Sequence, residues 1–216
     1  SRSLQGVITD NATVEFSQHV DGIFNGSFAG NGIIEKKGLG RLAFVFDSSA
    51  FTGTTNIRLG RLDLDTVLGG DIIVHEGGIL GGNGTVLGDL TVKPFGIVSP
   101  GHSVGTIVVG GDYHQESEGI YITQFNGLGL SSLIDVQGSG LLDAGSRLVC
   151  DARNGDPLIN KTYTVLRTDD GLTGQFTHVD TNNILVDPLV SYDSNNAYVT
   201  LMIAPQHVAD TYNQLQ

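Results

Sequence analysis

The chain has 216 residues, with 31 glycines, 5 prolines and 1 cysteine, and a net charge of −12 at pH 7. Its 11 Lys and Arg residues are scattered, which argues against nucleic acid and anionic membrane surfaces as partners. One cysteine cannot form an internal disulfide, and no apolar run reaches transmembrane length. The first five residues lack the features of a signal peptide, so we expect the chain to be one piece of a larger protein.

Short strands are predicted along the whole chain. They alternate apolar and polar residues, and the Gly, Asn, Asp and Ser between them supply tight turns. The predicted strands cover residues 12–16, 41–46, 55–59, 71–74, 90–92, 106–109, 120–125, 133–136, 147–150, 163–166, 175–179, 184–186 and 197–203. No helical period is long enough for βαβ crossovers, so either an antiparallel fold or a solenoid fits. The nearly even glycine spacing favours a solenoid, with about 20 residues per rung and on the order of ten rungs.

Two glycine repeats support the solenoid. The first spans residues 24–62, and the second runs from residue 69 to about residue 115. The candidate corner residues of the second repeat are Gly81, Gly82, Gly84, Ser99, Pro100, Gly101, Ser103, Gly105 and Thr106. The predicted inward apolar stripe consists of Ile72, Val74, Val86, Leu90, Val92, Ile107, Val109, Leu133, Val165, Leu201 and Ile203. We predict that these corners and this stripe determine the fold.

Towards the C-terminus the repeat loosens, with a turn cluster at residues 151–156. Residues 189–203 then predict a β-hairpin with its turn at residues 193–196. Its candidate residues are Tyr192, Tyr198, Val199 and Leu201. A hairpin here would cover the end of a solenoid, which otherwise exposes unpaired edge groups. We therefore predict that removing residues 190–203 prevents the remainder from folding. Pro205 ends the last strand, and residues 207–216 are a candidate helix start.

No motif for a cofactor or metal site is found in the sequence. In Gly82-Asn83-Gly84 the next glycine is Gly88, one place too late for G-x-G-x-x-G, and no helix is predicted to follow. The same run lacks the Asp of calcium-binding nonapeptide repeats. The six histidines, including His102, have no metal-site spacing. We therefore expect corner turns here and neither a cofactor nor a metal.

Catalytic motifs are likewise missing from the sequence. No serine has the G-x-S-x-G context of a nucleophile. Asp63 with Asp65 and Asp169 with Asp170 are attributed to chance among 23 acidic residues. Cys150 alternates with Leu148 and is predicted to be a buried small hydrophobe. We expect no catalytic residue and no enzymatic activity.

The repeats resemble those of a known family. Residues 24–62 resemble the autotransporter-associated β-strand repeat, G-x-G-x-L-x-K-x-G-x-G-x-L, with Ile33 in the first Leu position and an additional Lys37. Residues 81–107 resemble the G-G-x-G-T-V and S-P-G-x-S-x-G-T-(I/L) signature near the C-terminal end of autotransporter passenger domains, with His102 where Asn is common. Residues 162–166, 174–176, 189–193 and 198–201 extend the resemblance in order. It covers nearly all of the chain from Phe24 onward.

The resemblance implies an all-β fold, a right-handed parallel β-helix with a C-terminal β-hairpin cap. It divides the chain into β-helix rungs at residues 1–66, an autochaperone and cap at 67–204, and a linker at 205–216 towards an outer-membrane β-barrel. It implies a passenger of type V secretion on the bacterial surface or released from it. In proteolytic members of the family, the chemistry lies far upstream of this region.

Within this interpretation the chain acts as a folding template and stalk. Its implied partners are its own upstream rungs and its own C-terminal barrel, and host-cell ligands or sister cells are a further expectation. Two alternatives stay open at the level of the sequence. An adhesin module shares the same fold and would bind through exposed rung side chains. A β-helical polysaccharide-degrading enzyme would require a cleft with paired acids or a calcium site.

Overall fold

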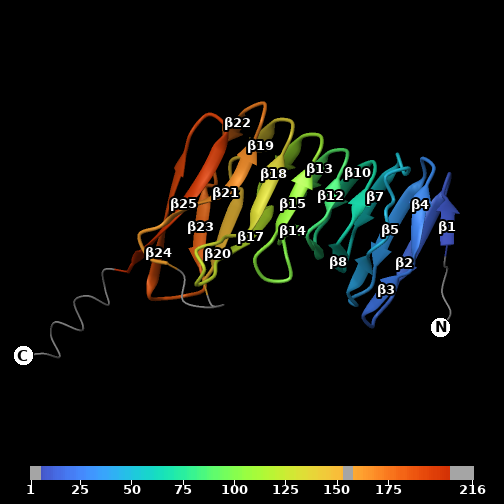
Figure 1. Cartoon of the computed structure of the whole chain (residues 1–216), viewed down its shortest axis with the longest axis horizontal. Coiled ribbons are helices and arrows are strands. Elements are labelled where there is room, and N and C mark those ends of the chain that lie inside the picture. The colour runs from blue at the N-terminus through green and yellow to red at the C-terminus, as the bar shows by residue number, and fades with distance from the viewer. Residues whose placement is uncertain (1–5, 153–157, 205–216) are drawn as a thin grey trace, which may run out of the picture.

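The computed structural model describes residues 6–152 and 158–204 (Figure 1). Every regular element in these ranges is a β-strand, and the strands stack into an elongated coil. The predicted all-β, parallel β-helix fold is confirmed. Among the described residues there is no helix long and apolar enough to cross a membrane. The predicted strand end at Pro205, the helix start at 207–216 and part of the turn cluster at 151–156 lie outside the described residues.

Three long sheets run along the coil. The first sheet contains, in spatial order, β2 (Thr13–Ser17), β5 (Ile33–Lys37), β7 (Thr54–Ile57), β10 (Asp71–Val74), β13 (Leu90–Val92), β16 (Tyr113–Gln115), β19 (Gly140–Leu142) and β22 (Leu172–Gly174). The second contains β3 (Gly22–Phe24), β6 (Leu42–Phe44), β8 (Gly60–Leu64), β11 (Gly78–Gly81), β14 (Ile97–Val98), β17 (Ile120–Gln124), β20 (Arg147–Asp151) and β23 (His178–Thr181). Neighbouring strands in both sheets pair in parallel.

The third sheet contains β9 (Val67–Leu68), β12 (Thr85–Val86), β15 (Thr106–Val109), β18 (Leu133–Val136), β21 (Thr162–Thr168), β25 (Asn196–Ile203) and β24 (Val186–Tyr192). It is parallel up to β21, and its last two strands form an antiparallel hairpin. This is the predicted C-terminal hairpin, with a longer first strand than expected. Near the N-terminus, β1 (Gly6–Thr9) and β4 (Gly26–Ala29) form a separate parallel pair.

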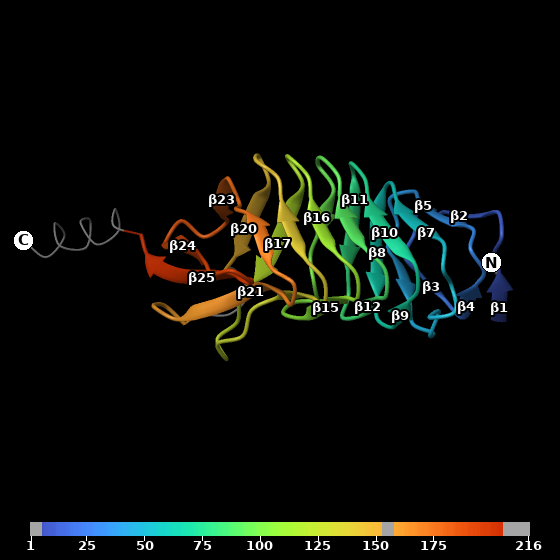
Figure 2. The same ribbon diagram turned by 90° about the horizontal axis from the view of Figure 1, so that it is seen from above.

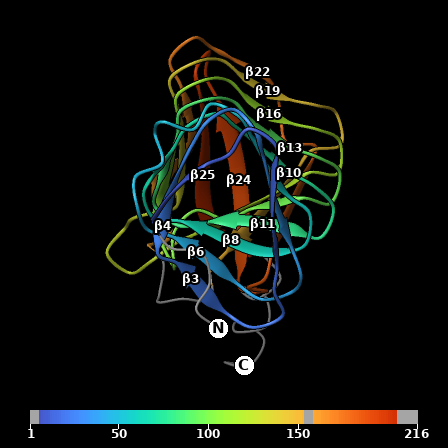
Figure 3. The ribbon, with the colours of Figure 1, turned by 90° about the vertical axis from the view of Figure 1, so that its right-hand side faces the viewer.

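The coil is right-handed. Figure 3 looks along it from the N-terminal end, with β10 and β13 of the first sheet on the right, β3 and β11 of the second at the bottom, and β4 on the left. The chain passes from right to bottom to left as it recedes, which is a clockwise path away from the viewer. Figure 2 shows the same rungs from above, with β24 and β25 at the C-terminal end.

The rungs lengthen towards the C-terminus. In the first sheet Ile72 pairs with Leu90, eighteen residues later, whereas Gly140 pairs with Leu172, thirty-two residues later. The extra residues enlarge the loops between strands, and the later rungs enclose a wider outline in Figure 3. The described part of the first sheet therefore has eight strands, fewer than the expected ten rungs, because the rungs do not keep a constant length.

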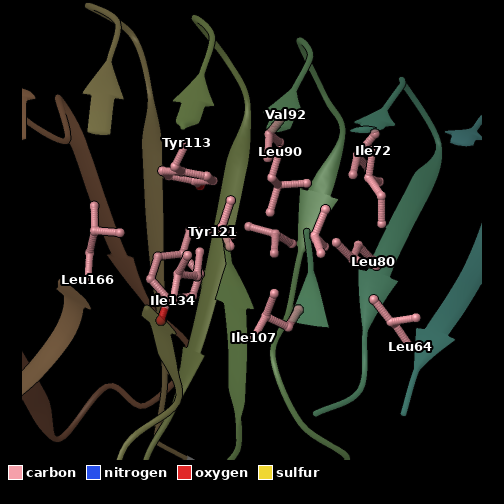
Figure 4. Close-up of a cluster of buried hydrophobic side chains, with 14 of the residues drawn as sticks. Leu64, Ile72, Leu80, Leu90, Val92, Ile107, Tyr113, Tyr121, Ile134 and Leu166 are labelled. Carbon is pink, nitrogen blue, oxygen red and sulfur yellow. The ribbon is translucent and has the colours of Figure 1, made fainter. Parts of the chain in front are cut away.

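The core lies inside the coil. It is formed by the side chains at every second position of each strand, which point inward. Its middle is aliphatic, with Leu64, Ile72, Leu80, Leu90 and Ile107 stacked along the axis (Figure 4). The N-terminal end is aromatic instead, and its ring centroids lie 4.8 Å (Phe24–Phe28) to 6.1 Å (Phe28–Phe51) apart. Tyr113, Tyr121 and Phe125 enter the core where the rungs widen, because larger side chains fill the added space.

Nine of the eleven residues predicted for the inward stripe are fully buried: Ile72, Val74, Val86, Leu90, Val92, Ile107, Val109, Val165 and Leu201. The other two predictions are wrong. Leu133 is half-buried because its neighbour Ile134 occupies the inward position of β18. Ile203 is 55% exposed because β25 extends past the end of the core. In the first repeat the inward residue is Ile34, and Ile33 faces outward.

Candidate functional site: the clamp loop and the terminal hairpin

The glycine run that begins at the last residue of β11 brings successive rungs into close contact. A Cβ atom on Gly81 would clash with the guanidinium group of Arg61, and one on Gly82 would clash with the carbonyl of Leu64. Gly82 also has a φ of +89°, which is unfavourable for residues with side chains. Gly84 lies equally close to the rung before it. These glycines therefore pack against the preceding rung at a corner of the coil.

Residues 99–106, which we call the clamp loop, bond back to the preceding rungs. The Ser99 amide donates to the Leu80 carbonyl over 2.8 Å. The Gly101 amide donates to the Gly82 carbonyl over 2.7 Å, and the Gly101 carbonyl accepts a hydrogen bond of 3.0 Å from Arg61 Nη2. Since Arg61 lies two rungs earlier, the loop spans more than the adjacent turn of the coil.

The clamp loop also bonds forward to the following rung. Ser132 is fully buried, and its Oγ lies 3.1 Å from the Pro100 carbonyl and 3.4 Å from the Ser103 carbonyl. The amide of Leu133 donates to the Gly105 carbonyl over 2.9 Å. The loop is therefore a polar connection between the rungs on either side of it.

Asn83 links the glycine run to the end of the clamp loop. Its Oδ1 accepts a hydrogen bond from the Thr106 amide over 3.2 Å, and a Cβ atom on Gly105 would clash with the same oxygen. The backbone amide of Asn83 in turn donates a hydrogen bond to Asp65 Oδ1 over 3.2 Å. The two sequence segments that form the predicted corner signature therefore meet in space.

A charged cluster, not predicted from the sequence, anchors the clamp loop. The carboxylate of Asp63 is fully buried between Arg41 and Arg61, with Arg61 Nε 2.6 Å from its Oδ1. The hydrogen bond that Arg41 donates to Asp63 raises the pKa of Arg41. His102 Nε2 lies 2.9 and 3.0 Å from the two carboxylate oxygens of Asp65. The sequence signal for this cluster is the spacing Arg-x-Asp-x-Asp at residues 61–65.

The terminal hairpin packs into the core through β25. Val199 and Leu201 are fully buried, and Leu201 belongs to the predicted inward stripe. The hydroxyl of Tyr192 accepts a hydrogen bond of 2.9 Å from the Phe176 amide, which joins β24 to the loop after β22. Figure 3 shows β24 and β25 crossing the opening of the coil. The hairpin therefore covers the C-terminal end of the core.

The hairpin turn is held by one carboxylate and docks on the neighbouring corner. Asp193 Oδ1 accepts hydrogen bonds from the amides of Asn195 (2.8 Å) and Asn196 (2.7 Å), and Tyr198 donates its hydroxyl hydrogen to Asp193 Oδ2 over 2.7 Å. These bonds lower the pKa of Asp193 to about 2, the Asn195 amide contributing most. Asn195 Nδ2 donates to the Thr168 carbonyl over 2.9 Å.

Other candidates for chemistry are not assembled into a site. Across residues 6–152 and 158–204, no three His, Cys, Asp or Glu side chains come together as a metal site. His75 bonds to Asn56 over 2.8 Å, and His114 pairs with Asp143 over 3.2 Å. Cys150 is buried, and this burial raises the pKa of its thiol to about 12. His207 lies outside the described residues.

The chain is thus a segment of right-handed β-helix with an anchored loop and a closed C-terminal end. It is similar to an extracellular serine protease of Serratia marcescens, at 27% identity over 181 residues. That similarity covers 80% of this chain and 17% of the length of the protease. No protein-family model matches the chain.

The comparison corrects one expectation. The comparison contradicts the prediction that the protein has no enzymatic activity, because a relative that the chain matches is an enzyme. The prediction rested on the motifs of this chain, and the chain corresponds to 17% of the protease. A search for catalytic motifs within such a segment does not address the chemistry of a whole protein.

Proposed function

We propose that this chain is the C-terminal β-helix of an autotransporter-type passenger, where it serves as a folding template and stalk outside the cell. The single observation that carries the proposal is the difference between its two ends. The C-terminal end is closed by the antiparallel hairpin β24–β25. At the N-terminal end, β2 and β3 are the first strands of their sheets, and no strand of residues 6–152 and 158–204 pairs with their outer edges. A new rung therefore has a place to pair at one end.

The edge strand of the hairpin supports the addition of new rungs at the N-terminal end and not at the C-terminal end. Pro188 lies within β24, the last strand of the third sheet. Proline lacks the amide hydrogen needed by a ladder, so it discourages the addition of a further strand. The open strands β2 and β3 contain no proline. The similarity to an extracellular protein supports a secreted or surface-exposed location.

The proposal is tested by removing the cap. We expect that a chain without residues 190–203 loses its cooperative thermal melt, followed by circular dichroism. The matched point variants are Val199→Asp, which puts a charge into the core, and Leu189→Asp, which changes a side chain 61% exposed on the same hairpin. Val199→Asp should abolish the melt and Leu189→Asp should leave it unchanged. An unchanged melt in the truncated chain would contradict the proposal.

The secretion part is tested in the full-length protein. We expect the same deletion to abolish display of a folded, protease-resistant passenger, while Leu189→Asp is displayed normally. Normal display of the deleted protein would refute the template role and leave the fold unaffected.

The activity of a longer protein is a second proposal, carried by the similarity to a serine protease. We propose that a longer protein containing this segment hydrolyses peptide bonds with residues outside residues 1–216. A fluorophosphonate probe, which reacts with activated serines, should label the longer protein. Labelling of the isolated 216-residue chain would contradict this assignment, as would a longer protein that does not react.

A further inference from the structure

Two polar side chains occupy the same inward column of the first sheet. The column is defined by registered pairs between successive strands, and its members from β5 to β19 are Lys36, Ile57, Val74, Val92, Gln115 and Leu142. All are buried, and Lys36 and Gln115 are completely inaccessible. Four of the six are apolar, so the two polar residues stand where the fold otherwise uses Ile, Val and Leu.

Lys36 bonds to the backbone of two successive rungs. Its Nζ donates to the Gly38 carbonyl of its own corner over 2.8 Å and to the Leu59 carbonyl of the next corner over 2.9 Å. A third carbonyl, that of Lys37, lies 3.4 Å away. Burial lowers the pKa of Lys36. The ammonium group therefore depends on these carbonyls in place of water.

Gln115 makes the same connection farther along the coil. Its Nε2 donates to the Gly119 carbonyl of its own corner over 2.6 Å and to the Arg147 carbonyl of the next rung over 2.9 Å. Its Oε1 accepts a hydrogen bond of 2.8 Å from the buried hydroxyl of Tyr113. Lys36 and Gln115 thus each connect two neighbouring corners of the coil through hydrogen bonds made inside the core.

We propose that Lys36 and Gln115 are register-determining residues that fix which residues of neighbouring rungs pair. Alternation alone prevents a slip of one residue, because that slip turns the inward residues outward. A slip of two residues keeps the alternation, and the aliphatic column accepts it because its members are similar in shape. Such a slip moves a strand by about 6.6 Å, which takes Lys36 Nζ away from the Leu59 carbonyl.

A slipped rung would then hold an unpaired polar group in the apolar core. An unsatisfied buried donor is costly, and an unpaired buried charge costs more. The native register is favoured because only this register satisfies the hydrogen-bond donors of both Lys36 and Gln115. The biological meaning of this register control rests on the proposed template function. A folding template must pass a single strand register on to the next rung.

The test reads register with cysteine pairs in the purified 216-residue chain after refolding. Ile33→Cys with Thr54→Cys reports the native register, because these residues are opposite each other in β5 and β7. Ile33→Cys with Thr52→Cys or Asn56→Cys reports a slip of two residues in either direction. In the native register the slipped pairs are about 8 Å apart, beyond the reach of a disulfide. Cys150 is buried and common to every variant.

In the Lys36→Met background we expect the slipped disulfides to increase about tenfold relative to the native one, since removing the donor removes the penalty for slipping. Ile57→Met, an apolar exchange in the same column, should leave only the native disulfide. Lys36→Gln should restore most of the native disulfide, because Gln115 serves in the same column. Refolded Lys36→Met with the native disulfide alone would overturn the proposal for this site, and so would a variant that remains unfolded.

The second site gives an independent reading. His114→Cys with Leu141→Cys reports the native register of β16 and β19. Gln115→Met should weaken this disulfide while leaving the β5–β7 pairs native. The effect should be smaller than at Lys36, because Asp112 also bonds the Ser139 amide over 2.8 Å at this rung. An identical effect on both strand pairs would contradict local register control. All these disulfide measurements use the purified chain and do not depend on secretion. The register proposal can therefore fail while the template function holds, and the reverse.

Discussion

At the scale of single residues, polar side chains at the corners fix one rung to the next. Asp71 Oδ1 accepts a hydrogen bond from the Asp89 amide over 2.9 Å, and Asp89 Oδ1 accepts one from the Asp112 amide over 2.8 Å. A Cβ atom on the preceding Gly88 or Gly111 would clash with these carboxylates. Each Gly-Asp pair thus leaves room for the carboxylate below and supplies the carboxylate for the rung above.

The buried carboxylate of Asp63 gives the sharpest test at this scale. We expect Asp63→Asn to lower the free energy of unfolding by about 2 kcal/mol, because Arg41 and Arg61 lose the charge between them while remaining partly hydrated. The control is Asp65→Asn, which affects a pair with the half-exposed His102 and should cost less than about 1 kcal/mol. Urea denaturation measures both. Equal losses for the two variants would disprove a special role for burial at Asp63.

At the scale of elements, alternation in the sequence predicts some strands and misses others. The predictions for residues 71–74, 90–92, 106–109 and 133–136 match β10, β13, β15 and β18 at both ends. The two-residue strands β9, β12 and β14 were missed, because two residues carry no alternation. Longer strands were missed as well, namely β1, β3, β4, β5, β8, β11, β16, β19 and β22. The side facing the core at Leu133 and Ile134 was also misjudged, since both are large aliphatic residues. Only the stacking of neighbours decides between them.

Only part of the candidate site was predictable from the sequence, because some of its residues leave a local signal and others meet only in the folded coil. Glycines with a special backbone conformation leave a signal in a repeat, so Gly82 and Gly101 were found. The partners of the clamp loop were not found, because Arg61 reaches the Gly101 carbonyl, and Arg41 reaches Asp63, only after the rungs stack. Distances across rungs depend on rung length, and rung length varies along this chain.

The hairpin predicts a specific dependence on acid. The pKa of Asp193 falls from 3.8 to about 2 on folding, so its contribution to stability is complete above pH 4 and is lost as the pH falls towards 2. Asp193→Asn removes this contribution. The difference in urea midpoint between wild type and Asp193→Asn should therefore shrink from pH 6 to pH 2. Asp187→Asn, in β24 and away from the turn, is the control. A difference that stays constant over this range would contradict the assignment.

At the scale of the whole molecule, the coil is a linear array in which each rung contacts its neighbours, so opening need not be uniform. The cap and the clamp loop hold the C-terminal part, whereas β2 and β3 are edge strands in the part of the chain that the structure describes. We expect the N-terminal rungs to open more often. Two buried thiols measure this. Cys150 is the native probe, in β20, and Thr55→Cys adds a probe in β7 at a hydroxyl that forms no hydrogen bond.

Both thiols are inaccessible in the closed coil, so a thiol reagent at pH 8 labels each only when its rungs open. Low urea should label Thr55→Cys faster than Cys150, and the labelled peptides identify each site. Removal of the cap residues 190–203 should raise the rate at Cys150 more than the rate at residue 55. Equal rates in the complete chain would mean that the coil opens as a single unit. The difference between its ends would then have no consequence for how rungs form.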